Sequence, residues 1–204
     1  MKIGCCIPKS QIECFRIKDE FDFIEAKYSV IKADKDSYQE LNLFALNNIL
    51  SRDINIFNQP IAETKITIDR LFEVAKNYGI QLITFGSGGA RKFLGSHDLS
   101  KNISTWVEIL NYFDSKAIEH DIDVGIEPLS KLETNFINTI AEAAFYIDQL
   151  ELQRIGITAD TFHFFDSDGS LINLKEHFGK IKHVHIASDK RKYPKSISSQ
   201  NRTF

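Results

Sequence analysis

Three polar residues in the second half of the chain follow or close short apolar segments, and their side chains are of the kinds that bind divalent metal ions. Glu127 follows IDVGI, Asp160 follows IGITA, and His185 lies within IKHVHI. Two carboxylates and an imidazole suit Mn²⁺, Mg²⁺, Co²⁺ or Zn²⁺. Any one of the three could instead be a buried hydrogen-bonded residue, because a buried carboxylate needs a partner. Their convergence on one space would favour a metal site.

The segments that must position these residues alternate between strand and helix patterns along the whole chain. Such alternation predicts an α/β fold with a parallel sheet and right-handed crossovers, and seven units with no break in composition favour a barrel. The predicted strands, all short and rich in Ile, Val and Phe, are residues 2–7, 22–26, 53–57, 80–85, 122–126, 155–159 and 181–186.

Between the predicted strands, apolar residues recur at the spacing of an amphipathic helix. We expect Asn135 to cap the helix before strand 155–159, and Gly79 to end the helix before strand 80–85. The apolar stripes are Ile68, Leu71, Phe72 and Ala75, then Trp106, Ile109, Leu110 and Phe113, then Ile137, Ile140, Ala141 and Ala144.

The chain is shorter than a complete barrel of this kind. A complete (β/α)8 TIM barrel has eight strands and about 250 residues, whereas this chain has 204. Residues 195–204 show neither strand alternation nor a helical stripe. We therefore predict an incomplete TIM barrel of seven βα units over residues 1–194, with the eighth strand missing, and an irregular tail at 195–204.

In such barrels the site lies at the carboxyl ends of the strands, and alternation along each strand decides which side chains point inward. If the apolar residues of the last three strands face outward to the helices, then Glu127, Asp160 and His185 face inward together. His183 shares the face of His185 but lies about 6–7 Å deeper. Alternation alone does not separate these two histidines. We assign His183 a hydrogen-bonded role inside the barrel.

Composition excludes several classes of function. The net charge is −3, and the one basic cluster lies near the C-terminus, which disfavours nucleic acid as a partner. No apolar run is long enough to span a membrane. The three cysteines, Cys5, Cys6 and Cys14, form no CxxC pair. We read them as small apolar residues of a protein in a reducing, cytoplasmic compartment.

Four segments resemble one known family. GIEPLSKLETNF, TADTFHFF, HVHIASDKRKYP and TFGSGGARKF are similar to the xylose isomerase-like barrels, in particular to the sugar phosphate isomerases and epimerases that include the D-tagatose and D-psicose 3-epimerases. The resemblance extends from Met1 to about Pro194. It implies a metal-dependent enzyme of carbohydrate metabolism with a small sugar, or sugar phosphate, as its substrate.

The resemblance also implies individual roles. Glu127, Asp160 and His185 match three of the family's four metal ligands, and Arg191, six residues after His185, supports His185 over His183 as the ligand. Glu127 also matches one of the two acid/base glutamates.

Other residues match positions around the sugar. Glu133, His163 and Arg191 match residues that hold the sugar oxygens. Gly86 and Ser87 belong to the loop after the fourth strand, which shapes the pocket. Ordinary structural roles for these five residues remain open: a first-turn charge, a surface histidine, a basic tail and turn residues.

The implied reaction is proton transfer at the carbon next to a ketose carbonyl, through an enediolate stabilised by the metal. It is the chemistry of a ketose 3-epimerase or an aldose–ketose isomerase. The family's fourth ligand is a glutamate on the eighth strand that is also the second acid/base, and residues 195–204 contain no Asp or Glu. We therefore expect impaired activity. Without an eighth strand, we also expect exposed edges on strands one and seven, covered in solution by aggregation or by a partner such as a second copy.

Two other functions compete with this interpretation. A non-catalytic remnant or binding protein would also explain a chain without the last glutamate. An AP endonuclease of the endonuclease IV type shares the barrel, the D-x-x-H element and a histidine after the fourth strand, here His97. That enzyme also needs a histidine near the third strand, where the predicted segment NIFNQP has none.

Overall fold

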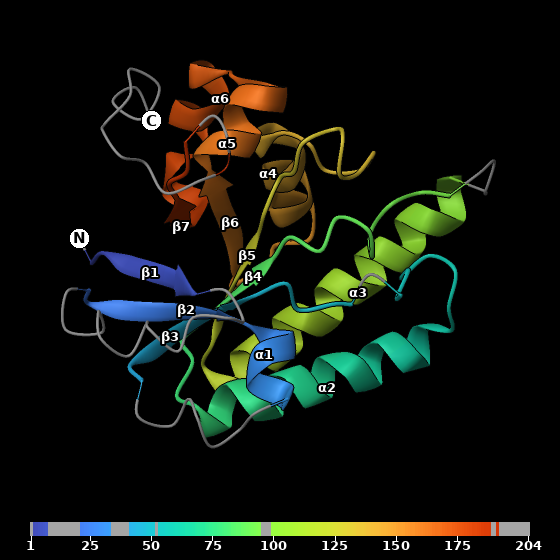
Figure 1. The fold of residues 1–204 in the computed structure, drawn as a ribbon. Helices are drawn as coiled ribbons and strands as arrows, with labels where there is room; N and C mark the ends of the chain where they lie inside the picture. The colour runs from blue at the N-terminus through green and yellow to red at the C-terminus, as the bar shows by residue number, and fades with distance from the viewer. Residues whose placement is uncertain are drawn as a thin grey trace.

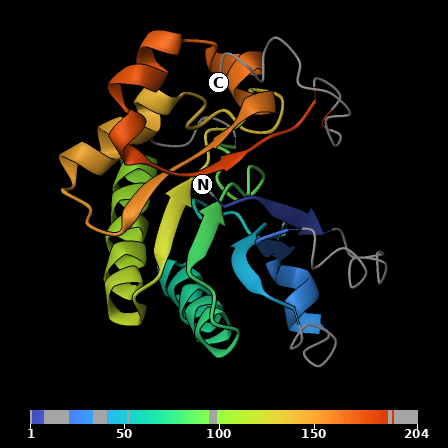
Figure 2. The ribbon, with the colours of Figure 1, turned by 90° about the vertical axis from the view of Figure 1, so that its left-hand side faces the viewer.

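The computed structural model describes residues 2–7, 21–33, 41–51, 53–94, 99–188 and 191. Its centre is one parallel sheet with the strand order β1-β2-β3-β4-β5-β6-β7, in which each strand pairs with its sequence neighbours. The sheet is curled (Figures 1 and 2), so that side chains of β7 hydrogen-bond to a side chain of β2 across the interior. The strands are β1 (Gly4–Ile7), β2 (Phe23–Lys27), β3 (Leu43–Asn47), β4 (Leu82–Phe85), β5 (Asp123–Ile126), β6 (Ile155–Asp160) and β7 (Ile181–His185).

This architecture confirms the predicted incomplete (β/α)8 barrel of seven strands. Within the described residues, β1 pairs only with β2, and β7 pairs only with β6. The predicted tail at 195–204 lies outside the described residues, as do Cys14 and His97. Among the described residues, no helix has the length and apolarity needed to cross a membrane.

Helices cover the outer face of the sheet. Phe72 of α2 contacts Phe113 of α3, with ring centroids 6.1 Å apart, and Phe113 stacks in turn near Phe85 of β4 at 4.9 Å. The helical segments are α1 (Tyr28–Ala33), α2 (Ile61–Asn77), α3 (Leu99–His120), α4 (Ile140–Gln149), α5 (Thr161–His163), the π-helical segment η4 (Phe164–Asp168), α6 (Leu171–Glu176) and the 3-10 segment η5 (Phe178–Lys180).

The third strand was predicted wrongly. Residues 53–57 form a turn, and β3 is Leu43–Asn47. Ile56 of the turn donates its backbone N–H to the carbonyl of Ala90 and is fully buried. Asn55 donates to the carbonyl of Lys92. The turn therefore packs under the loop after β4, and its alternating Ile residues reflect burial in a loop rather than pairing in a sheet. β3 itself, LFALN, is composed largely of good helix formers.

The predicted start and the predicted buried face of the helix before β6 both change. The stripes of α2 and α3 are buried as predicted, and Gly79 follows α2 with φ 66°. The next helix begins later than expected, because Thr139 and Glu142 form a capping box at its start. Asn135 is not the cap, and its Oδ1 accepts instead from the N–H of Phe93. The buried face of α4 is consequently Ile140, Ala143, Ala144 and Ile147.

Side-chain alternation in the last strands follows the prediction. The apolar residues of β5 and β6 lie in the core between sheet and helices. The interior face is polar, with Thr84 of β4 and Thr158 of β6 hydrogen-bonded at 3.2 Å. Gly125 lies between them, and a Cβ there would be 2.1 Å from Thr158 Oγ1. The interior is therefore packed below the strand ends, which places the open space at the ends themselves.

Candidate metal and sugar site

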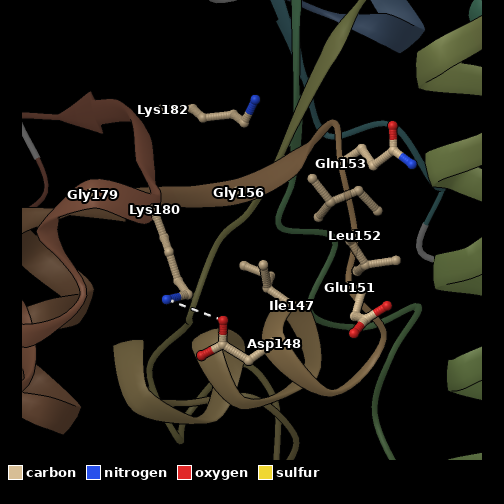
Figure 3. Close-up of a pocket in the computed structure, with 10 residues that line it drawn as sticks. Ile147, Asp148, Glu151, Leu152, Gln153, Gly156, Gly179, Lys180 and Lys182 are labelled. Atoms are coloured by element: carbon tan, nitrogen blue, oxygen red, sulfur yellow. Dashed lines mark ion pairs between the residues drawn. The ribbon is translucent and has the colours of Figure 1, made fainter.

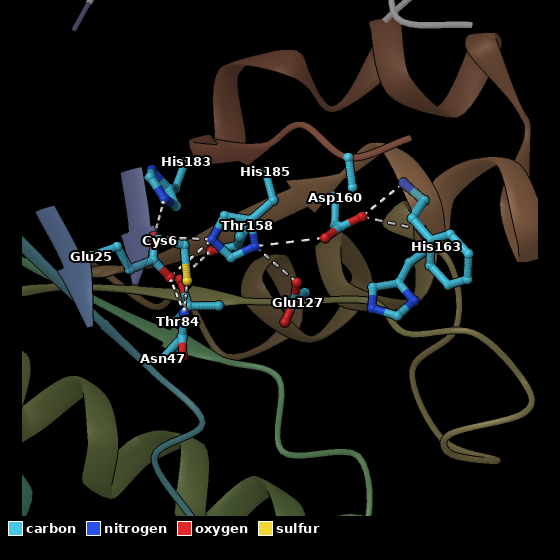
Figure 4. Close-up of polar contacts among 12 residues, drawn as sticks. Cys6, Glu25, Asn47, Thr84, Glu127, Thr158, Asp160, His163, His183 and His185 are labelled. Carbon is cyan, nitrogen blue, oxygen red and sulfur yellow. Dashed lines mark hydrogen bonds and ion pairs between the residues drawn. The ribbon is translucent and has the colours of Figure 1, made fainter. Parts of the chain in front are cut away.

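The three predicted ligands come together at the ends of β5, β6 and β7 (Figure 4). Nδ1 of His185 lies 3.1 Å from Oε1 of Glu127 and 3.7 Å from Oδ2 of Asp160. The side chains of both carboxylates are about one-tenth exposed or less. Three donor atoms from three neighbouring strands thus surround one small space, as the alternation argument requires.

The end of β6 leaves one oxygen of Asp160 free for this space. Asp160 caps the short helix α5, and its Oδ1 accepts the backbone N–H groups of Phe162 and His163. Its Oδ2 is the oxygen that faces His185. The cap therefore fixes the carboxylate while leaving one oxygen to act as a ligand.

Glu127 is held from both sides. Gly86, directly after β4, has no side chain, and a Cβ at that position would lie 2.3 Å from Oε2 of Glu127. The backbone carbonyl of Glu127 accepts from the guanidinium of Arg91, which also donates to the carbonyls of Gly86 and Phe136. Arg91 is fully buried, and burial lowers its pKa to about 10. The loop after β4 therefore supports the glutamate at the end of β5.

Electrostatics in the site favour an ionised Glu127 and a protonated His185 in the metal-free chain. Burial would lower the pKa of His185, but Glu25 and Glu127 raise it well above its usual value. Burial would raise the pKa of Glu127, but the hydrogen bond from His185, together with the nearby charges of His185 and His163, lowers that pKa. Burial, followed by the nearby charge of Glu127, raises the pKa of Asp160. A cation placed among these groups would relieve the repulsion between the two carboxylates.

His163 is a second candidate to complete a ligand group with Glu127 and Asp160, since suitable atoms of the three lie within 4.8 Å of one another. Its ring is already occupied, however. Nδ1 lies 3.1 Å from the backbone N–H of Ser130, and Nε2 lies 3.2 Å from Nη2 of Arg191. Because the backbone N–H of Ser130 donates to Nδ1, that nitrogen accepts and the ring proton of the neutral imidazole lies on Nε2, so no lone pair remains for a metal. We therefore favour His185 as the third ligand.

The structure also brings together the three residues predicted to hold sugar oxygens. Nη1 of Arg191 contacts Oε1 of Glu133, and Oε1 of Glu133 lies 3.9 Å from Nε2 of His163. The guanidinium of Arg191 lies over the ring of Phe162. His163 is buried, whereas the side chain of Arg191 is half exposed. This polar group adjoins the three ligands through Asp160 and the helix α5.

Of the two predicted loop residues, neither has a side-chain atom that faces this space. Gly86 contributes the close approach to Glu127. Oγ of Ser87 accepts the backbone N–H of Leu50, which joins the loops after β3 and β4. Their observed contacts are therefore structural.

Sequence reasoning missed two buried charged residues, Glu25 and Arg91. Glu25 on β2 contacts both His183 and His185 (Figure 4), and the alternation rule applied to FIEAK would have turned it inward. Arg91 carries no such signal, because an arginine in the segment GGARKF reads as a surface residue.

A pocket of about 540 Å³ lies away from these residues. It is lined by residues such as Leu152, Gly156, Lys180 and Lys182, at the start of β6 and β7 (Figure 3). Glu127, Asp160 and His185 are at the opposite ends of their strands. The pocket therefore does not contain the candidate site.

The chain is similar in sequence to known proteins. The family model described as xylose isomerase-like TIM barrel matches residues 11–202. The 3-dehydro-D-guloside 4-epimerase of Escherichia coli (strain K12) is 34% identical over 74 residues, which is 36% of this chain and 28% of that protein. The ketose 3-epimerase of Arthrobacter globiformis is 28% identical over 79 residues, which is 38% of this chain and 27% of that protein.

A solved structure has the same fold over nearly the whole chain. The 3-keto-D-glucoside 4-epimerase from E. coli in its apo form superposes with a TM-score of 0.80 at 23% identity, over 96% of this chain and 82% of that one. The sequence matches to curated relatives span under a third of those proteins' lengths.

Proposed function

The chain belongs to the xylose isomerase-like TIM barrel family, and from that premise we propose that it is a metal-dependent isomerase or epimerase of a ketose sugar or sugar phosphate. The observation that carries the proposal is the grouping of Glu127 Oε1, Asp160 Oδ2 and His185 Nδ1 at three adjacent strand ends. Relatives that are sugar epimerases support the reaction class. A small sugar in the cytoplasm, rather than nucleic acid or a membrane, is the proposed partner.

The donor set fits a divalent cation. Two carboxylate oxygens and one imidazole nitrogen suit Mn²⁺, Co²⁺ or Mg²⁺, and Zn²⁺ is also compatible. The cap that occupies Oδ1 of Asp160 leaves Oδ2 for this purpose. When bound, such a cation would stabilise the negative charge on the sugar oxygens as the adjacent carbon loses its proton.

Glu127 is the proposed proton acceptor. Its lowered pKa keeps it ionised at neutral pH, which is the form that accepts a proton. Its Oε1 faces His185, while its Oε2 lies against Gly86. Because Gly86 and Arg91 hold the carboxylate and its backbone, Glu127 reaches the reacting carbon without reorganisation, as an effective general base requires.

Glu133, His163 and Arg191 are the proposed sugar-binding group. The buried ring of His163 is fixed by the N–H of Ser130, and it meets Glu133 and Arg191 at a surface that solvent reaches. Charged donors and acceptors of this kind can exchange their mutual contacts for sugar hydroxyls. We propose no direct sugar contact for the side chains of Gly86 and Ser87, which shape the site through the loop.

Full epimerisation also needs a proton delivered to the opposite face of the carbon. The family resemblance assigns that step to a glutamate on an eighth strand, and the described part of this chain contains seven strands. Loss of a general acid/base costs about 10²–10⁴-fold. We therefore propose that the 204-residue chain removes the proton more readily than it completes the epimer.

The test is hydrogen exchange into the sugar. The chain is incubated in D₂O with Mn²⁺ or Co²⁺ and a ketohexose, and deuterium at C3 is followed by NMR. We expect slow exchange that falls about 10²–10⁴-fold in Glu127→Gln and is unchanged in Glu63→Gln, an exposed glutamate of α2.

Three outcomes would contradict the proposal. A chain that binds the metal and the sugar without exchange would be a binding protein or remnant. Epimer formation as fast as in complete relatives would refute the impairment. Nicking of abasic DNA would favour the endonuclease, although the residues directly after β3, Asn48–Leu50, contain no histidine.

A further inference from the structure

Glu25 is a buried carboxylate outside the three proposed ligands. It lies on β2, far in sequence from β5–β7, and its side chain is only 3% exposed. A buried carboxylate without hydrogen-bond donors is costly, and Glu25 has three. Nδ2 of Asn47 donates to Oε1 at 2.6 Å, Nε2 of His183 approaches Oε2 at 2.8 Å, and Nε2 of His185 lies 3.0 Å from both oxygens.

The ring of His185 separates Glu25 from the proposed ligands. Its Nδ1 faces Glu127 and Asp160, and its Nε2 faces Glu25. The two ring nitrogens direct their lone pairs or protons away from one another, so Glu25 cannot share the cation that Nδ1 would bind. It lies behind the ligand and accepts a hydrogen bond from it.

We infer that Glu25 is a positioning residue for the metal site, an inference that rests on the proposed function. By accepting the proton on Nε2 of His185, Glu25 fixes the tautomer whose Nδ1 lone pair faces Glu127 and Asp160. It also sets the angle of the ring. A metal-bound histidine that donates its other N–H to a carboxylate is held and made more basic by it.

The same arrangement gives His183 and Asn47 a role. Both donate to Glu25, and neither approaches Glu127 or Asp160 in any contact of the described residues. They hold the carboxylate of Glu25 as it holds His185. The two histidines of the H-x-H pattern on β7 therefore have different roles. His185 faces the proposed metal site, and His183 supports the carboxylate of Glu25 behind it.

Glu25, His183 and His185 could instead bind a cation themselves, since their ligand atoms also lie within 4.8 Å of one another. The observed contacts favour hydrogen bonding, because Nε2 of His185 lies at 3.0 Å from both oxygens of Glu25 and Asn47 occupies one of them. The stoichiometry of metal binding distinguishes the two possibilities.

The experiment compares metal affinity in the 204-residue chain. Co²⁺ is titrated into the wild type and Glu25→Gln, with binding followed by calorimetry and by the visible absorption of the bound ion. We expect one site per chain and an affinity about 10–100-fold weaker in Glu25→Gln. Glu108→Gln, which removes a surface ion pair with Lys65, is the matched control and should bind as the wild type does.

A second readout reports the tautomer directly. In ¹⁵N NMR of the Zn²⁺-bound wild type, His185 should carry its proton on Nε2 and a metal-shifted Nδ1, with a strongly deshielded, slowly exchanging Nε2–H. In Glu25→Gln that proton should move upfield and exchange faster. Should Glu25→Gln fail to fold, Asn47→Ala removes one donor to Glu25 and should give a smaller change in the same direction.

Several results would overturn the inference. These are an unchanged affinity in Glu25→Gln, or a His185 that binds the metal through Nε2. Two cobalt ions per wild-type chain that fall to one in Glu25→Gln would establish a second metal site instead. If the wild type binds no metal, the proposed function fails, but Glu25 is still tested, because the metal-free wild type must show the protected Nε2–H that Glu25→Gln loses.

Discussion

The two sides of the candidate site are supported in different ways. On the side of β5 and β6, Glu127 and Asp160 are held by contacts to backbone. These are the hydrogen bonds that the guanidinium of Arg91 donates to backbone carbonyls (the Arg91 clamp), the close approach of Gly86 to Glu127, and the cap of α5 by Asp160. On the side of β7, the Nε2 side of the His185 ring is held by the carboxylate of Glu25, which reaches across the interior from β2. The outer face of β7 is also exposed, with Val184 at 42% and Ile186 at 60%.

This difference teaches how an incomplete barrel can still assemble a site. The outer apolar residues of β5 and β6 are buried under helices, so those strands are fixed independently of the open edge. The outward side chain of Val184 on β7 is 42% exposed, and the inward histidines of this strand are joined to β2 by charged hydrogen bonds. Such bonds are stronger than neutral ones. We therefore expect changes on the β5–β6 side to lower stability most, and changes on the β7–β2 side to act mainly on metal binding.

The largest expected loss of stability is on the side of β5 and β6, where contacts to backbone hold the site. Arg91→Met removes a buried guanidinium and leaves the carbonyls of Gly86, Glu127 and Phe136 without their donor. Each buried acceptor left without its donor costs about 1–3 kcal/mol, and three lose the same donor here. We expect a decrease of at least that size in the free energy of unfolding, measured with urea. Arg154→Met, at a partly exposed arginine paired with Asp123, should cost about 1 kcal/mol or less. Equal losses of unfolding free energy in the two variants would show that the Arg91 clamp stabilises the fold no more than a partly exposed ion pair does.

A smaller effect is expected where the loop after β4 meets Glu127. Gly86→Ala places a methyl group 2.3 Å from Oε2 of Glu127, so the carboxylate must move. Overpacking costs about 1–3 kcal/mol, and we expect weaker Co²⁺ binding together with a lower unfolding free energy. Gly89→Ala is the control, since a Cβ there meets nothing within 4 Å. Unchanged cobalt affinity in Gly86→Ala would place Glu127 outside the metal site.

Some parts of the structure could be predicted from the sequence and others could not. Period-two alternation located the ends of β5, β6 and β7, because a one-residue error would turn every apolar residue of these strands to the wrong face. It failed for β3, because Ile56 is buried beneath the loop after β4 and Ile54 packs partly against the core, without either residue belonging to a strand. Local pattern does not distinguish a buried turn from a strand.

The supports of the site were harder to predict than the site itself. Glu127, Asp160 and His185 each close a recognisable apolar segment, so their positions follow from local sequence. The contact between Glu25 and His185 joins residues 160 positions apart, and only the curvature of the sheet creates it. The hydrogen bonds of Arg91 to backbone carbonyls depend likewise on the paths of two loops, those after β4 and β5, which no periodicity encodes.

The third prediction uses pH to separate the two sides in the metal-free chain. The pKa of His185 is raised well above its usual value. Its contribution to stability is therefore complete below about pH 6.5 and is lost as pH rises through the folded-state pKa. Glu25 and Glu127 have lowered pKa values, so their contributions are complete above about pH 4.3 and are lost as pH falls.

With a chelator present, we therefore expect the thermal midpoint to fall as the pH rises above about 6.5. The fall should be smaller in Glu25→Gln, because Glu25 is the first of the charges that raise the pKa of His185. Glu108→Gln, on the surface of α3, should keep the wild-type slope. A wild-type midpoint that rises over this range would contradict the protonated state of His185.

The smallest effect is expected at the outer face of β7. Val184→Thr changes a side chain that is 42% exposed, and surface substitutions usually alter stability by within about 0.5 kcal/mol. The buried counterpart on β6, Ile157→Val, should cost about 0.5–1.5 kcal/mol, since Ile157 is fully buried. Urea unfolding at several protein concentrations measures both. A loss above about 1 kcal/mol in Val184→Thr, or a concentration-dependent midpoint, would mean that a second copy covers β7 in solution. In that case the open edge would be an interface, and the dependence of His185 on Glu25 would be shared with a partner.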